Sequence, residues 1–353
     1  MAQINKPNEY FNTVLWSGDN ATNKAITGVN FQPDLVWIKA RTEVHQHNLF
    51  DVIRGVNKNL SSNLTSAEAT DNLYGYLASY DTDGFTTQKG SSSGQWNVNE
   101  TGENYVAWNW LADNTSGSSN TDGSITSTVS ANTTSGFSIV SYTGNGTDGA
   151  TVGHGLGVVP NIVLIKKRST AGNHWIMYHS ALPSANYFLY LCDTDPQQTA
   201  TGFFNNTAPT SSVFTIGSDA QVNANTSTLI AYCFAEKKGF SKFGSYTGNG
   251  SANDGTFIYT GFKPSWVMMK RTNTTGEWGM FDNKRNSFNV ATAELKANAS
   301  DAEEVNGAID FLSNGFKLKA TSAFMNASGS TYIFMAFAEN PLVGTNNIPT
   351  TAR

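Results

Sequence analysis

Short apolar runs alternate with clusters of glycine, asparagine, serine and threonine along the whole chain. Three of the longest runs begin one or two residues after a proline, at Pro33, Pro160 and Pro264, and each ends in lysine and arginine. Proline has no N–H to give to a strand ladder, so it is tolerated where a strand begins and not inside one. The runs therefore predict strands that are buried on both faces and lie in the interior of a sheet.

The same order of signals occurs three times. A polar turn comes first, then the proline-led run, and an aromatic-rich apolar run closes each copy. The turns lie at 16–20, 142–146 and 246–250, and the closing runs lie at 105–110, 229–236 and 332–339. Self-similarity at a period of roughly one hundred residues indicates one supersecondary unit built three times.

The repeat predicts an all-β fold of three tandem β-sandwich or jelly-roll-like domains with minimal helix. The predicted divisions are a first sandwich at 1–112, a polar flexible joint at 113–125, a second sandwich at 126–238, a third at 239–341 and a C-terminal tail at 342–353. Helical signals are limited to one or two turns near 66–71 and 300–305, where Ser or Asp precedes Ala and Glu.

Composition narrows the function classes. Aromatic residues make up 12% of the chain, which is enough apolar surface to favour folding over disorder. The net charge of -5 and the lack of a Lys/Arg cluster argue against nucleic acid as a partner. The first residues contain no apolar segment like a secretion signal, and no run of about eighteen apolar residues predicts membrane insertion. Cys192 and Cys233 are expected to be buried free thiols inside apolar, strand-like runs.

One aligned position predicts structural ion pairs. The first and third copies carry an acid followed three residues later by an arginine, and the second copy carries neither. The sets are Asp51 with Arg54, His179 with Leu182, and Asp282 with Arg285. Joint loss of the acid and the arginine is what a local ion pair would show and an independent catalytic acid would not.

Tryptophans are the remaining candidates for binding. Trp108 and Trp110 alternate along a strand, so they share one face, and the matching Phe234 and Phe337 indicate that this face is core. Trp96, Trp175 and Trp278 lie in or beside polar segments, so either core packing or stacking on a sugar ring is open to them.

Metal and cofactor chemistry find little support in the sequence. His45 and His47 could share a strand face, but no cysteine or carboxylate has matching spacing, and surface histidines are the simpler reading. Asp81 and Asp83 lie in a turn without the twelve-residue calcium loop. We therefore expect no bound metal, no cofactor and no catalytic residues.

Three segments resemble a known family. The opening 5–13, the segment 28–39 around Phe31-Gln32-Pro33-Asp34, and the closing 332–340 are similar to an uncharacterised β-repeat family in virion proteins of tailed, often marine, bacteriophages. Proteins of that family are usually labelled tail fibre or tail-associated, and the family has no assigned catalytic residues. The resemblance covers nearly the whole chain and implies a virion component assembled in the bacterial host cytoplasm.

The combined expectation is a non-enzymatic structural and display protein of a virion. Its expected partners are other virion proteins, further copies of itself, and host-surface glycans held by multivalent weak binding. A capsid decoration or head-fibre protein is one alternative, since the sequence contains no long coiled coil or collagen-like shaft. A glycan depolymerase is another. It would need two carboxylates about 5 to 9 Å apart beside an aromatic groove, and no candidate pair stands out.

Overall fold

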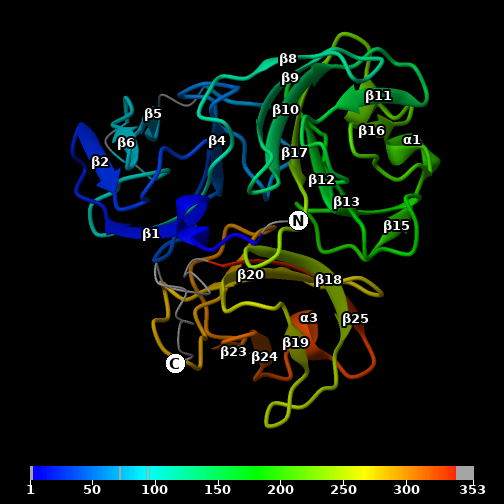
Figure 1. Ribbon diagram of the computed structural model, residues 1–353. Coiled ribbons are helices and arrows are strands. Elements are labelled where there is room, and N and C mark those ends of the chain that lie inside the picture. Colours follow the sequence, from blue (N-terminus) through cyan, green and yellow to red (C-terminus); the bar gives the residue numbers. More distant parts are fainter. Residues whose placement is uncertain (1–2, 71–72, 93, 95, 339–353) are drawn as a thin grey trace.

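The computed structural model describes residues 3–70, 73–92, 94 and 96–338. The chain is all-β, and the ladders between its named strands are antiparallel. It forms three units, each built from a larger sheet and a smaller sheet packed face to face, and the three larger sheets surround a common centre (Figure 1). The prediction of three β-sandwich units made from one repeat is confirmed.

The first unit occupies the blue and cyan part of the chain. Its larger sheet contains β1 (Phe11–Ser17), β7 (Asn104–Trp110), β3 (Leu35–Ala40) and β4 (Asn48–Asp51), in that spatial order. Its smaller sheet contains β2 (Asn23–Thr27), β6 (Gly84–Gln88) and β5 (Tyr76–Asp81). A 3-10 turn, η1 (Pro7–Glu9), precedes β1.

The second unit has the largest sheet. In spatial order it contains β15 (Gln198–Thr199), β14 (Tyr187–Tyr190), β13 (Trp175–His179), β12 (Ile162–Lys167), β17 (Thr228–Phe234), β10 (Phe137–Thr143), β9 (Ser127–Asn132) and β8 (Ser118–Asn120). The smaller sheet pairs β11 (Ala150–Gly153) with β16 (Val213–Ile216). The segment 113–125, predicted as a joint, contains β8.

The third unit repeats the pattern of the first. The larger sheet contains β18 (Ser241–Thr247), β25 (Thr331–Ala338), β20 (Pro264–Arg271), β21 (Trp278–Asp282) and β22 (Leu295–Lys296). The smaller sheet contains β19 (Phe257–Tyr259), β24 (Gly315–Leu318) and β23 (Ile309–Leu312). The predicted tail at 342–353 lies outside the described residues.

The three units share one topology. In each larger sheet the unit's closing strand lies between its opening strand and its proline-led strand, giving β1-β7-β3, β10-β17-β12 and β18-β25-β20. The residue three positions before each proline has a positive φ: 72° at Asn30, 67° at Gly157 and 83° at Gly261. Such a φ favours glycine or asparagine, so the turn before the strand is specified by residue type.

The helical predictions near 66–71 and 300–305 were wrong. The described residues there form no helix, and residues 71 and 72 lie outside the description. The short helices are instead α1 (Thr201–Phe204), α2 (Ala220–Asn223) and α3 (Ala323–Asn326). The two mispredicted segments run across neighbouring units: Glu68 N–H donates to Arg168 O, and Glu303 N–H donates to Arg41 O. These tertiary contacts outweigh local helix propensity.

The proline-led strands are buried on both faces, as predicted, because each faces two cores. On β3, Val36 and Ile38 face the core inside the first unit, whereas Leu35 and Trp37 face a core shared by all three units. The shared core is the largest apolar cluster of the described chain. Trp108 and Trp110 belong to it, which confirms that their face is core.

Aromatic rings from the three closing strands meet in the shared core. The ring centroid of Trp110 lies 6.2 Å from that of Phe234 and 5.7 Å from that of Phe337, and the two phenylalanines are 5.8 Å apart. These residues occupy the same position of the repeat, so the units are related by an approximate threefold axis. The apolar area between the sheets favours one body over three independent domains.

Candidate functional site

The aligned position that predicted ion pairs links each unit to the next one around the axis. The contacts are Asp51 with Tyr232 Oη (2.7 Å), Asp282 with Trp108 Nε1 (3.1 Å), and His179 Nε2 with the Phe334 carbonyl (3.2 Å). His179 Nδ1 accepts the Ala181 N–H, so Nε2 carries the proton and donates. The position is therefore a cyclic set of contacts from unit one to two, two to three, and three to one.

Both predicted ion pairs are present. Arg285 Nε donates to Asp282 Oδ2 at 2.5 Å, and Arg54 Nε donates to Asp51. All four side chains are fully buried. Each carboxylate also accepts the backbone N–H of its own arginine, at 2.9 Å for Asp51 and 2.8 Å for Asp282. The pairs thus close a local turn, as expected, and also hold a charged group against the adjacent unit.

Two further glutamates extend these pairs to the neighbouring units, and sequence reasoning missed both. The two chains of contacts are Arg54–Glu68–Arg168 and Arg285–Glu303–Arg41. Arg168 and Arg41 each donate two hydrogen bonds of 2.8–3.0 Å to their glutamate across a unit boundary. Such bidentate pairs fix orientation as well as adding attraction.

Trp175 and Trp278 are not glycan-stacking residues in this structure, which corrects that prediction. Both are buried, and each indole N–H donates to a backbone carbonyl of the preceding unit, as does the ring of His47 at the matching position. The contacts are Trp175 to Ser61 (2.8 Å), Trp278 to Tyr190 (2.9 Å) and His47 Nε2 to Lys296 (2.9 Å). A sugar could not reach either indole without separating the units.

His47 is buried, in contrast to the expected surface position. Trp37 Nε1 donates to His47 Nδ1 at 2.8 Å, so the proton lies on Nε2 and the ring is neutral. Burial is the main cause that lowers the pKa of His47 to about 3, and the nearby Lys39 charge adds to it. Both ring nitrogens already have partners.

We expect Trp278→Phe to lower the free energy of unfolding by about 2 kcal/mol, because the Tyr190 carbonyl loses its donor inside the core. Chemical denaturation of the purified chain measures this. Phe262→Leu, a buried change with no lost hydrogen bond across units, serves as a control for packing alone. A Trp278→Phe variant as stable as wild type would show that the contact between units contributes little.

Trp96 is the one predicted stacking residue at the surface, with 42% of its area exposed. The Tyr74 ring stacks on it at a centroid distance of 4.4 Å, and the His45 ring lies parallel to it at 5.7 Å. The three rings form a layered aromatic surface on the first unit. His45 therefore packs on an indole at the surface, whereas His47 is buried and bonds to another unit.

The turn aspartates considered for calcium are engaged by the protein. Asp83 accepts the Gly28 and Asn30 N–H groups at 3.1 and 2.6 Å, and Asp81 accepts the Ser79 and Thr86 hydroxyls at 2.8 and 2.7 Å. Within the described ranges, no group of three His, Cys, Asp or Glu side chains is placed to hold a metal ion. Cys192 and Cys233 are free thiols, as predicted, but only Cys233 is buried in a strand, whereas Cys192 lies in a turn and is partly buried.

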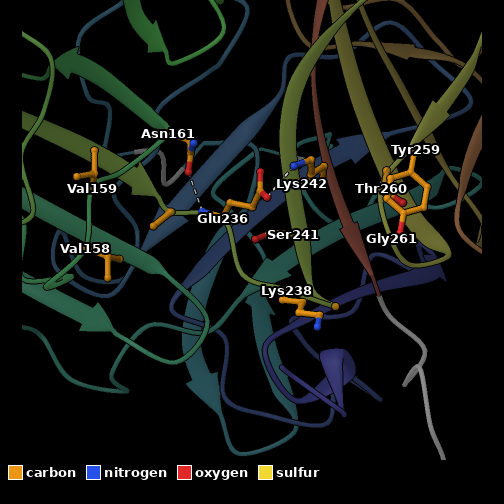
Figure 2. A pocket seen from close by; sticks show the side chains of 12 residues that line it. Val158, Val159, Asn161, Glu236, Lys238, Ser241, Lys242, Tyr259, Thr260 and Gly261 are labelled. Atoms are coloured by element: carbon orange, nitrogen blue, oxygen red, sulfur yellow. Dashed lines mark hydrogen bonds and ion pairs between the residues drawn. The ribbon is translucent and has the colours of Figure 1, made fainter. Parts of the chain in front are cut away.

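A cleft of about 580 Å³ opens between the second and third units. Figure 2 shows Val158 and Val159 on one side and Tyr259, Thr260 and Gly261 across from them. Val159 is 53% and Tyr259 64% exposed, so the cleft offers apolar side chains to solvent.

The floor of the cleft is polar. Glu236 pairs with Lys242 at 2.8 Å, and its N–H donates to Asn161 Oδ1 at 2.8 Å (Figure 2). Lys238 is exposed at the rim. Sequence reasoning missed this site, because its residues come from three segments that are distant in the chain, at 158–161, 235–242 and 259–261.

Comparison with known proteins identifies a family of unknown function. No curated protein and no solved structure matches the chain. No helix in the described part of the chain is long and apolar enough to cross a membrane. A family model described as a domain of unknown function, DUF7483, matches residues 6–341. The match runs through all three units, in agreement with their shared core, and the chain belongs to this DUF7483 family.

Proposed function

We propose that the protein is a non-enzymatic structural and display component of a bacteriophage particle. The resemblance of residues 5–13, 28–39 and 332–340 to virion proteins supports the particle role. The observation that carries the structural role is one position of the repeat, where the buried Asp51, His179 and Asp282 each bond to the next unit. Buried contacts of this kind hold the three units together, which suits a structural component that bears force or presents a binding surface.

The position on the particle is the first thing to test. We propose a tail fibre or tail-associated part, with a capsid decoration or head-fibre protein as the alternative. Purified particles labelled with an antibody against the chain, imaged by electron microscopy, separate the two. Label at the tail supports the first and label on the capsid supports the second. A chain missing from purified particles by mass spectrometry contradicts the proposal as a whole.

We further propose that the display surface binds host-surface glycans at Trp96. The stacked rings of Trp96, Tyr74 and His45 form an exposed aromatic surface for a sugar, and many copies per particle convert weak contacts into avidity. Trp96→Ala is expected to reduce retention on host polysaccharide at least about tenfold, the effect of losing a central tryptophan contact. Loss of the two ring contacts with Tyr74 and His45 should lower the free energy of unfolding by about 1–3 kcal/mol, which leaves the variant folded.

The matched control is Trp278→Phe, which alters a buried tryptophan and should be retained on the polysaccharide as well as wild type is. Equal retention by wild type and Trp96→Ala would contradict the glycan proposal. Incubation with the same polysaccharide also tests the depolymerase alternative, since released oligosaccharides would favour an enzyme.

A further inference from the structure

The second unit contains a strand with no counterpart in the described parts of the other two units. β9 pairs with the outer edge of β10 over six residues, from Phe137 with Asn132 to Tyr142 with Ser127. β9 also packs against the loop before β12: a Cβ at Gly155 would lie 2.9 Å from the Val129 side chain. The chain thus fills the groove between a sheet edge and a neighbouring loop with its own extended segment.

Among residues 3–338 as described, no strand pairs with the equivalent edge of the third unit. β18 takes the place of β10 and forms the end of its sheet in the described chain. Ala338 N–H donates to Phe240 O, and Gly248 N–H donates to Ser330 O, so the even-numbered residues between them bond to β25. The N–H and C=O groups of Phe243, Ser245 and Thr247 therefore point outward.

These outward groups have little to bond. Phe243 N–H lies 3.5 Å from Glu236 Oε2, and Thr247 O accepts the Thr256 hydroxyl at 2.9 Å. Ser245 is exposed, and nothing in residues 3–338 as described bonds to its outward backbone. An exposed row of backbone donors and acceptors is a template for another strand.

The cleft between the second and third units runs beside this edge. Ser241 and Lys242 of β18 line it, and so do Tyr259 and Gly261. Tyr259 occupies the repeat position of Gly155, against which β9 packs in the second unit. The cleft is therefore the β9 groove without a strand, with an exposed tyrosine where the second unit has a glycine.

The first unit does not offer the same groove. Its edge strand is β1, where Phe11, Asn12, Thr13 and Val14 are buried. Thr13, an outward-facing residue of this edge, has its N–H bonded to Asn12 Oδ1 at 2.9 Å. The β18 edge, in contrast, combines an exposed stretch with the adjacent cleft.

We propose that the outer edge of β18 is a strand-acceptor site for an extended segment of another polypeptide. The segment pairs antiparallel to β18 in the place that β9 takes on β10, with small apolar and polar side chains alternating as in 128–131. Main-chain hydrogen bonds supply the affinity, and the exposed ring of Tyr259 narrows the space that Gly155 leaves open for β9 in the second unit. Lys238, Lys242 and Glu236 leave one net positive charge, which favours an acidic residue near the cleft.

A peptide of residues 124–134 is the direct probe, because it carries the β9 sequence. We expect saturable binding of the labelled peptide to the full chain, measured by fluorescence anisotropy. Hydrogen exchange in 241–247 should slow when the peptide binds. Ser245→Pro removes an outward donor without touching the β25 ladder, and should weaken binding at least about tenfold.

Two matched variants keep the test decisive. Leu15→Pro places the same residue at the same repeat position of β1 and should leave binding unchanged. Tyr259→Gly copies Gly155 and should tighten binding several-fold, which a loss of folding could not produce. Absence of saturable binding would overturn the proposal, as would equal binding by Ser245→Pro. Protection of 241–247 by an oligosaccharide and not by the peptide, or by self-association alone, would also overturn it.

Discussion

Replacing Arg54 by methionine is expected to lower the free energy of unfolding of the whole chain by about 3–5 kcal/mol. Asp51 and Arg54 are fully buried, and the substitution leaves a carboxylate in the core with its main counter-charge removed. The Tyr232 hydroxyl and one backbone N–H would still donate to it, at 2.7 and 2.9 Å. These neutral donors do not replace a guanidinium. Urea denaturation followed by tryptophan fluorescence measures the change.

The second unit supplies the control for this experiment. His179 and Leu182 occupy the positions of the acid and the arginine there, and the contact to the next unit is made by a neutral ring. The double variant Asp51→His with Arg54→Leu copies that solution into the first unit. It should stay within about 1.5 kcal/mol of wild type, because no charge is left unpaired. A double variant as unstable as Arg54→Met would show that packing around the site, and not the lone carboxylate, dominates.

The sequence predicted the fold of each unit because the relevant signals are local. A residue tolerant of positive φ, then a proline, then an apolar run are sufficient to place a buried strand, and their threefold recurrence identified the repeat. Asn30, Gly157 and Gly261 stand at one position for one reason, the positive φ before the strand. The ion pairs were also visible, since both partners lie on one turn.

The arrangement of the units was not predictable in the same way. The larger sheets have two apolar faces, and a sequence does not say whether the second face is covered by a helix, a second copy or another unit. Trp175 and Trp278 lie beside polar segments in the chain, but those segments are the rims of contacts between units. Neighbours in sequence therefore misled the glycan prediction.

A usable signal for the contacts between units was present but was interpreted as helix. Glu68 and Glu303 both follow a Ser-Ala or Asp-Ala pattern, which resembles a helix start. A glutamate follows each Asp–Arg pair, and the second unit, which lacks the pair, also lacks a glutamate at the matching place. The ion pairs were identified from a joint loss of the same kind. Applied to the glutamates, that comparison would have indicated partners in the arginine network.

Three lysines at one position of the repeat give the second large expected effect. Lys39, Lys166 and Lys270 are buried, and each lies six residues after the proline that leads the central strand of its unit. Lys270 Nζ donates to Thr194 O of the second unit and to Gly276 O, at 2.8 and 2.7 Å. The partners of these ammonium groups are mainly carbonyls. Desolvation is the leading cause that lowers the pKa of all three to about 8.

A lysine whose pKa is lower in the folded state than in the unfolded state binds fewer protons when folded. Between about pH 8 and the ordinary value near 10.4, the unfolded chain holds the extra proton, so the free energy of unfolding rises with pH. Each lysine should contribute about 2 kcal/mol of this rise between pH 7.5 and 9.5. Burial raises the pKa of Cys233 to about 12, and this opposes the rise above the ordinary cysteine value.

The contribution of one lysine is isolated by comparing Lys270→Met with wild type across that range. The variant leaves the Gly276 carbonyl without the lysine donor, whereas the Thr194 carbonyl keeps the Gly276 N–H at 2.9 Å, and neither effect depends on pH. Titration of the cysteines and tyrosines affects both proteins alike, so it cancels when their free energies of unfolding are subtracted. The gap between the two free energies of unfolding should therefore change by about 2 kcal/mol from pH 7.5 to 9.5 in favour of wild type at the higher pH. Lys284→Met, at an exposed position, should show no such change. A constant gap for Lys270→Met would mean that its carbonyl partners and the nearby acids fully compensate the buried charge.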